Sequence, residues 1–119
     1  MPIDFRIDDG IGIYTTVGDV DYQEGISVLN NGLDKLNALE PVLILFDIRK
    51  TGEHRTPEEI RDIAEIVRSY FSKKIKIALV AQSDLYYGLS RIFAAYVEDT
   101  GVAVQVFKKY DDSLAWLKQ

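Results

Sequence analysis

The sequence predicts a single α/β domain with a mixed, mostly parallel five-stranded sheet and four helices in the order β-β-α-β-α-β-α-β-α. The first observation is that residues 42–46 are continuously apolar, as in a strand covered on both faces. The second is an alternation of apolar and polar residues before Asp9 and Gly10, which indicates an edge hairpin. The third is the alternation of helix and strand patterns after that hairpin, which is typical of parallel sheets.

Five segments have strand patterns, and the run that starts at Val42 is expected to be the central strand. Within the hairpin, Ile11, Ile13 and Val17 should lie on one face and Tyr14 on the other. The central strand becomes polar at Asp47 and Arg49, where open α/β sheets usually place their binding crevice. The strands are expected at residues 3–8, 11–17, 42–49, 75–81 and 102–106.

Four segments have helix patterns. The first, residues 21–39, begins at Asp21, and the second begins at Thr56, which forms a capping box with Glu59. The second ends at residues 73–74, the third runs from about residue 83 to 100, and the fourth covers residues 111–117. The inner face of the third helix is expected to hold Leu85, Leu89, Ile92, Phe93 and Tyr96.

Composition and charge exclude several classes of function. A chain of 119 residues is long enough for one domain, residues 1–119, with a real core. Acidic residues outnumber basic ones 19 to 14, and no basic field suitable for nucleic acid is visible. The absence of cysteine excludes disulfides and thiolate metal sites. Because the longest apolar run is too short to span a bilayer and no signal peptide is visible, we expect a cytoplasmic protein without membrane insertion.

Three stretches carry a resemblance to a known family. They are the polar end of the central strand at Asp47 and Arg49, the segment 84–93, and the final strand and helix at residues 104–107 and 113–117. Together with the topology, these stretches resemble the SpoIIAA-like proteins of the STAS group (sulfate transporter and anti-sigma-factor antagonist domains). The resemblance covers nearly the whole chain, and it implies a STAS-like fold and a regulatory rather than a catalytic role.

The sequence departs from this family at one position. The anti-sigma-factor antagonists are phosphorylated on a serine at the start of the helix after the third strand, in an Asp-Ser-Ser-Gly type motif. Residues 47–52 contain no serine here, so Thr51 and Thr56 are the candidate phosphorylation sites. Other members of the wider group are thought to hold small apolar or lipid-like ligands, as the CRAL-TRIO lipid-transfer domains do.

Six residues are candidates for contact with a ligand or a partner. Asp47 and Arg49 point to the same side of their strand, where they form either an anion-binding site or a structural ion pair. Ser83 stands at the start of the third helix, where it either helps to hold an anion or acts as the N-cap. The remaining three, near the start of that helix, are Tyr86, Tyr87 and Arg91. Tyrosine and arginine are enriched at binding hot spots. Alternatively, Tyr87 and Arg91 simply stack on one another at the surface.

The sequence shows no signature of catalysis. The single histidine, His54, has no second ligand at a metal-binding spacing, and it is expected to be a solvated loop residue. No nucleophile–base pair and no phosphate-binding loop are visible, so no enzyme activity, no metal and no cofactor are expected.

We therefore expect a non-catalytic regulatory or protein-interaction module of STAS-like type that acts through a protein partner or as a homodimer. Its contact surface is expected where the third strand ends and the third helix begins. The alternative is a carrier or sensor of a small apolar or anionic, lipid-like ligand held beneath that helix. A cavity lined by Tyr14, Phe71, Tyr86 and Phe93 would favour this alternative.

Overall fold

The structure is a computed structural model that describes residues 2–52, 55–70, 75–97 and 102–119. Within these segments the predicted elements appear in the predicted order. The strands are β1 (Ile3–Asp8), β2 (Ile11–Gly18), β3 (Val42–Thr51), β4 (Ile75–Val80) and β5 (Val102–Phe107). The helices are α1 (Tyr22–Leu36), α2 (Pro57–Tyr70), α3 (Asp84–Val97) and α4 (Tyr110–Leu117).

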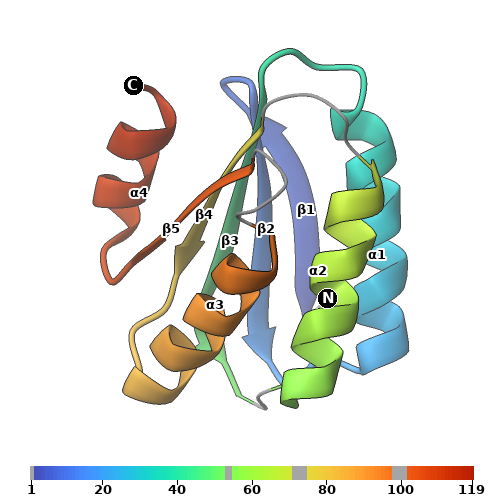
Figure 1. Cartoon of the computed structure of the whole chain (residues 1–119), viewed down its shortest axis with the longest axis vertical. Helices are drawn as coiled ribbons and strands as arrows, with labels where there is room; N and C mark the ends of the chain where they lie inside the picture. Colours follow the sequence, from blue (N-terminus) through green and yellow to red (C-terminus); the bar gives the residue numbers. More distant parts are fainter. Residues whose placement is uncertain (1, 53–54, 71–74, 98–101) are drawn as a thin grey trace.

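The five strands form one sheet in the order β1-β2-β3-β4-β5. β1 is antiparallel to β2, and the other pairs are parallel, so β3 is the central strand as predicted. The carboxyl ends of β2, β3 and β4 therefore meet at one edge of the sheet, the lower edge in Figure 1. α1, α2 and α3 each begin close to this edge.

Helices cover both faces of the sheet. α1, α2 and α3 lie on one face, and α4 packs on the other, against β3, β4 and β5 (Figure 1). Each face has its own apolar cluster: Ile44 belongs to the cluster under α1–α3, and its neighbour Leu45 belongs to the cluster under α4. This arrangement explains why β3 reads as a continuous apolar run, since successive side chains of a strand point to opposite faces.

Local sequence signals account for two of the connections. The turn between β1 and β2 holds Asp9 and Gly10 at φ values of 52° and 78°, which is the backbone of the primed hairpin turn that was predicted. At the start of α2, Glu59 N donates to Thr56 Oγ1 at 3.2 Å and Thr56 N donates to Glu59 Oε1 at 3.0 Å. The predicted capping box is therefore present.

A glycine inside α1 is explained by a close approach between the helix and the sheet. Gly32 is buried, and a side-chain carbon at this position would overlap the ring and hydroxyl of Tyr14 and approach Phe5 to 2.8 Å. Glycine is unfavourable inside a helix by about 1 kcal/mol relative to alanine. Here it lets α1 lie directly on the side chains of β1 and β2.

The predicted inner face of α3 is partly wrong. Leu89 and Phe93 are buried as expected, but Leu85 is 53% exposed, and Ile92 and Tyr96 are each 36% exposed. Apolar residues occur on two sides of this helix at three- and four-residue spacings, so periodicity alone does not select the buried side. The side that packs on the sheet holds Leu89, Ser90, Phe93, Ala94 and Val97.

Some predicted features lie outside the described residues: Phe71, His54, and the ends proposed for the second and third helices at residues 73–74 and 100. α1 ends at Leu36, three residues before the predicted end. None of the helices in the described segments is both long and apolar enough to cross a membrane.

Candidate functional site

A cavity of about 160 Å³ lies beneath α3, between the first turns of α1, α2 and α3 and the carboxyl-terminal halves of β2, β3 and β4. Apolar side chains from each of the three helices form its walls, among them Ile26, Ile60 and Leu89. Protein interiors are close-packed and contain few voids larger than a water molecule. A cavity of this size at the carboxyl edge of a parallel sheet is therefore the candidate functional site.

The floor of the cavity is formed by aromatic rings from β2, β3 and α3. The ring centroids of Tyr14 and Phe46 are 5.0 Å apart in a stacked pair, and those of Phe46 and Phe93 are 6.0 Å apart in an edge-to-face pair. Tyr14 Oη donates a hydrogen bond to the carbonyl of Leu29 at 2.8 Å. Burial, with smaller contributions from Tyr70 and Asp34, raises the pKa of Tyr14 far above its ordinary value. The floor is therefore uncharged and held in place.

The main cation at the rim is already engaged with other groups. Arg55 donates a hydrogen bond to the carbonyl of Val20, and its guanidinium carbon lies 5.4 Å from the ring centroid of Tyr22. The carboxylate of Glu59 is 3.6 Å from Arg55 Nη1. Burial raises the pKa of Tyr22, and the carboxylates of Asp62 and Glu59 raise it further. The rim is therefore more acidic than basic.

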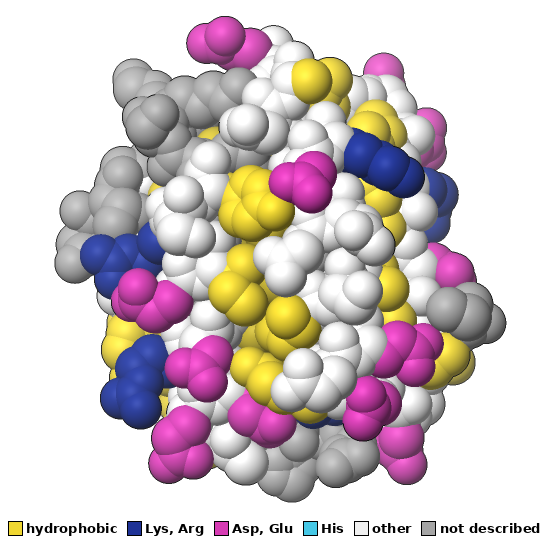
Figure 2. Space-filling view, turned by 90° about the vertical axis from the view of Figure 1, so that its right-hand side faces the viewer, with side chains coloured by type: hydrophobic (Ala, Val, Ile, Leu, Met, Phe, Trp, Pro, Cys, Tyr) yellow, Lys and Arg dark blue, Asp and Glu magenta, His cyan; other side chains and the backbone are white. Residues whose placement is uncertain are grey.

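Acidic side chains also dominate the surface around this end of α1 and α2. Figure 2 shows a band of apolar side chains on this side of the molecule, bordered in its lower half by carboxylates. The first turns of α1 and α2 contain Glu24, Glu58 and Glu59, and Asp21 lines the cavity itself. An anionic ligand would approach this opening against the local charge.

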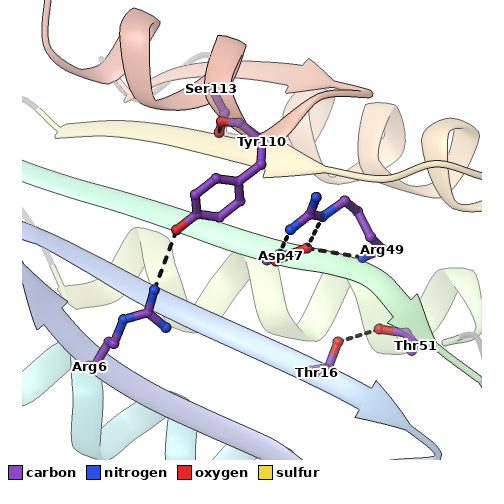
Figure 3. Close-up of polar contacts among 7 residues, drawn as sticks. All are labelled: Arg6, Thr16, Asp47, Arg49, Thr51, Tyr110 and Ser113. Carbon is purple, nitrogen blue, oxygen red and sulfur yellow. Dashed lines mark hydrogen bonds and ion pairs between the residues drawn. The ribbon is translucent and has the colours of Figure 1, made fainter.

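Two further polar contacts close the side of the rim nearest β3. Tyr86 Oη donates to the carbonyl of Gly52 at 3.3 Å, which links the start of α3 to the end of β3. The hydroxyl groups of Thr16 and Thr51 are hydrogen-bonded to one another (Figure 3). Thr51, a candidate phosphorylation site, is therefore half-buried and already engaged in this contact.

A buried serine of α3, Ser90, also lines the cavity. Ser90 is 3% exposed, and its Oγ forms no hydrogen bond within the described part of the chain. A second buried helical serine, Ser113, behaves in the ordinary way: its Oγ donates to the carbonyl of Tyr110 at 2.6 Å. Because buried polar groups in proteins are nearly always hydrogen-bonded, the free hydroxyl of Ser90 requires an explanation.

Asp47 and Arg49 lie on the opposite face of the sheet, under α4 (Figure 3). Arg49 Nε and Nη2 donate to the two carboxylate oxygens of Asp47 at 2.8 and 2.9 Å, and the guanidinium carbon of Arg49 lies 4.9 Å from the ring centroid of Tyr110. Burial alone would raise the pKa of Asp47, but the hydrogen bonds and charge of Arg49 outweigh it and lower the pKa. The two side chains thus form an ion pair, the arrangement expected in one of the two alternatives considered from the sequence.

The other predicted site residues are distributed over α3 and the start of α2. Ser83 Oγ accepts a hydrogen bond from Tyr86 N at 3.1 Å, so Ser83 is the N-cap of α3. The ring centroid of Tyr87 lies 5.5 Å from Lys108 Nζ, and Arg91 is exposed on the outer side of the helix. Thr56 is exposed and caps α2.

The sheet thus separates two groups of predicted residues. Tyr86 lines the cavity on one face of the sheet, whereas Asp47 and Arg49 lie on the other face.

The sequence patterns did not identify Ser90 as a residue of the cavity. The signal available was a serine four residues after Tyr86, between the apolar residues Leu89 and Phe93 of the same helix. In the described segments, no three acidic or histidine side chains group together as a metal site would require.

Comparison with known proteins agrees with this architecture. The chain is similar in structure to a protein of the DUF3478 family with a SpoIIAA-like fold from Shewanella loihica PV-4, with a TM-score of 0.62 and 17% sequence identity. The match covers 97% of this chain and 91% of that one. This protein therefore has a SpoIIAA-like fold, as the sequence predicted. No family model and no curated protein matches the sequence.

Proposed function

We propose that this protein is a non-catalytic module that binds a small apolar ligand beneath α3, as a carrier or sensor. The observation that supports this most strongly is the apolar cavity of about 160 Å³ with its fixed aromatic floor. An engineered apolar cavity of about 150 Å³ in another protein binds benzene. Tyr14, Tyr86 and Phe93 all line the cavity, and Phe71, the fourth residue expected there, lies outside the described residues.

Filling the cavity is expected to abolish binding. Gly25 lines it, and a side-chain carbon added there would meet Val20 Cγ1 at 3.5 Å, which is ordinary contact, so leucine can extend into the cavity without displacing the backbone. Toluene at high concentration should raise the melting temperature of the wild type by several degrees, because a ligand that binds only the folded state stabilises it. Gly25→Leu should show no such increase in a thermal denaturation assay.

Gly88→Leu is the matched control for this experiment. Gly88 is exposed on α3, away from the cavity lining, and an added side-chain carbon would meet nothing within 4 Å. This variant should respond to toluene as the wild type does. A wild type that does not respond, or a Gly25→Leu variant that responds equally, would refute the ligand-binding proposal.

A second candidate function is the protein-interaction module, and the outer side of α3 favours it. Leu85, Ile92 and Tyr96 are exposed and lie along one line of the helix. Arg91 is exposed on the same helix, and Tyr87 is half-buried beside Lys108. An exposed apolar helix face can pair with the same face of a second copy about a two-fold axis, so the occupant that we propose is a second copy of this chain.

Charging this face is expected to prevent self-association. The wild type should form a dimer as its concentration rises, and Leu85→Glu with Ile92→Glu should remain a monomer, as measured by sedimentation. The same change on the hairpin, Ile7→Glu with Val17→Glu, replaces two side chains that are 45% and 50% exposed and should leave the dimer intact. A wild type that stays monomeric, or dimers in the α3 variant, would exclude this surface.

A further inference from the structure

We infer that the ligand is a hydrocarbon about the size of one aromatic ring, without any hydrogen-bonding group, and that the hydroxyl pair of Thr16 and Thr51 helps to exclude polar molecules of the same shape. The inference rests on the proposed ligand-binding function and specifies the ligand of that same cavity. Three properties of the cavity support it: its size, the state of the polar groups along its wall, and the charge at its rim.

The size and the floor of the cavity favour a single ring. A volume of about 160 Å³ holds a benzene-sized molecule. The rings of Tyr14, Phe46 and Phe93 line one side of it, already stacked or edge-to-face with one another. A further aromatic ring can extend this row with the offset or edge-on contacts that aromatic pairs prefer.

Three side chains of the wall have hydroxyl groups that are bonded within the protein or covered by it. Tyr14 Oη donates to the carbonyl of Leu29 at 2.8 Å, and Tyr86 Oη donates to the carbonyl of Gly52 at 3.3 Å. Ser90 Oγ has no hydrogen-bond partner within the described part of the chain, but surrounding atoms cover it completely. A ligand therefore meets an almost entirely apolar wall.

Thr16 and Thr51 are a further polar element of the wall, near the carboxyl ends of β2 and β3. Their hydroxyl groups are hydrogen-bonded to one another (Figure 3). A hydroxyl group on a ligand would lose its bonds to water on entering the cavity and would replace them poorly at this wall. The loss expected for a buried unpaired polar group is roughly five- to 150-fold in affinity.

Charged ligands gain little at the rim. Arg55 has the carbonyl of Val20 and the carboxylate of Glu59 as partners, so it offers little to an incoming carboxylate. Asp21 accepts a hydrogen bond from Glu24 N at 3.1 Å as the cap of α1, and it would repel an anion. Because Asp21 is exposed, an ammonium group beside it would form only a solvated surface ion pair, which contributes little to affinity.

The first test compares toluene, phenol, benzoate and benzylamine as ligands of the wild type, by isothermal titration or NMR. Phenol has nearly the shape of toluene, so its dissociation constant should be roughly five- to 150-fold higher because of the hydroxyl group alone. Benzoate and benzylamine should also bind more weakly than toluene. If any of the three polar compounds binds as tightly as toluene, the hydrocarbon inference is wrong and the cavity remains a ligand site. Failure of all four compounds to bind would refute both this inference and the proposed function.

Thr51→Val tests the hydroxyl pair. Valine has nearly the shape of threonine, and the change leaves the hydroxyl of Thr16 at the wall without its partner. The ratio of the phenol to the toluene dissociation constant should therefore fall roughly three- to tenfold, as expected for one net hydrogen bond, since the hydration of each ligand is the same in both proteins.

Thr15→Val is the matched control, because Thr15 is half-buried on the same strand as Thr16 but does not line the cavity. Its ratio should equal that of the wild type. An unchanged ratio in Thr51→Val, or an equal fall in Thr15→Val, would overturn the role assigned to the hydroxyl pair.

Discussion

Asp47→Ala is expected to lower the free energy of unfolding by about 2–3 kcal/mol. The Asp47 side chain is only 10% exposed and accepts two side-chain hydrogen bonds from Arg49. Without the carboxylate, the guanidinium would remain over Tyr110 with no counter-charge. Because the Arg49 side chain is 30% exposed and can reach water, the cost should be below that of a fully buried pair. Urea denaturation at neutral pH measures this change.

Replacing both members of the pair distinguishes a structural ion pair from a site that needs charge. Asp47→Leu with Arg49→Met keeps the approximate volume and leaves no unpaired charge. Its stability should be close to that of the wild type, since apolar replacements of buried ion pairs are often neutral or stabilising. Equal losses in the single and the double variant would show that the pair does not act through the mutual interaction of its charges.

The same pair predicts the direction of the pH dependence. The pKa of Asp47 is lower in the folded protein than in the unfolded chain, where it is about 3.9. A lowered pKa stabilises the folded state above the unfolded pKa, and this contribution is lost as the pH falls through the folded value. The wild type should therefore lose more stability than the double variant on acidification below about pH 4.

The sequence patterns predicted the fold correctly wherever local chemistry decides the structure. Three features depend on residues that are neighbours in the chain. They are the continuous apolar run of β3, the turn at Asp9 and Gly10, and the capping box at Thr56. The orientation of α3 was predicted poorly because Leu85, Ile92 and Tyr96 form as good an apolar stripe as the buried set. Contacts with the sheet, which are remote in sequence, decide which side is buried.

The site was predictable only in part, for a related reason. The cavity is assembled from Tyr14, Phe46 and Phe93, which lie on three elements far apart in the sequence. Its existence depends on how closely the helices approach the sheet, as the buried Gly32 illustrates for α1. From the sequence, a cavity lined by Tyr14, Phe71, Tyr86 and Phe93 was only the feature that would favour a carrier, and three of these residues, Tyr14, Tyr86 and Phe93, do line one. Ser90 could not be identified, because a free hydroxyl is a property of the packed structure.

The buried hydroxyl of Ser90 has a consequence for stability. It forms no hydrogen bond within the described part of the chain. A buried polar group without a partner costs about 1–3 kcal/mol. Ser90 and Ser113 provide a direct comparison, because both are buried helical serines and, among the residues that the structure describes, Ser113 has a hydrogen-bond partner and Ser90 has none.

Ser90→Ala is therefore expected to raise the free energy of unfolding by about 1–2 kcal/mol, since it removes the unpaired hydroxyl and introduces a better helix former. Ser113→Ala should lower it by roughly 0.5 kcal/mol, because the lost hydrogen bond to Tyr110 outweighs the gain in helix propensity. Urea denaturation of both variants, without added ligand, measures the difference in sign. If Ser90→Ala instead loses stability as Ser113→Ala does, the Ser90 hydroxyl is already hydrogen-bonded in the folded protein.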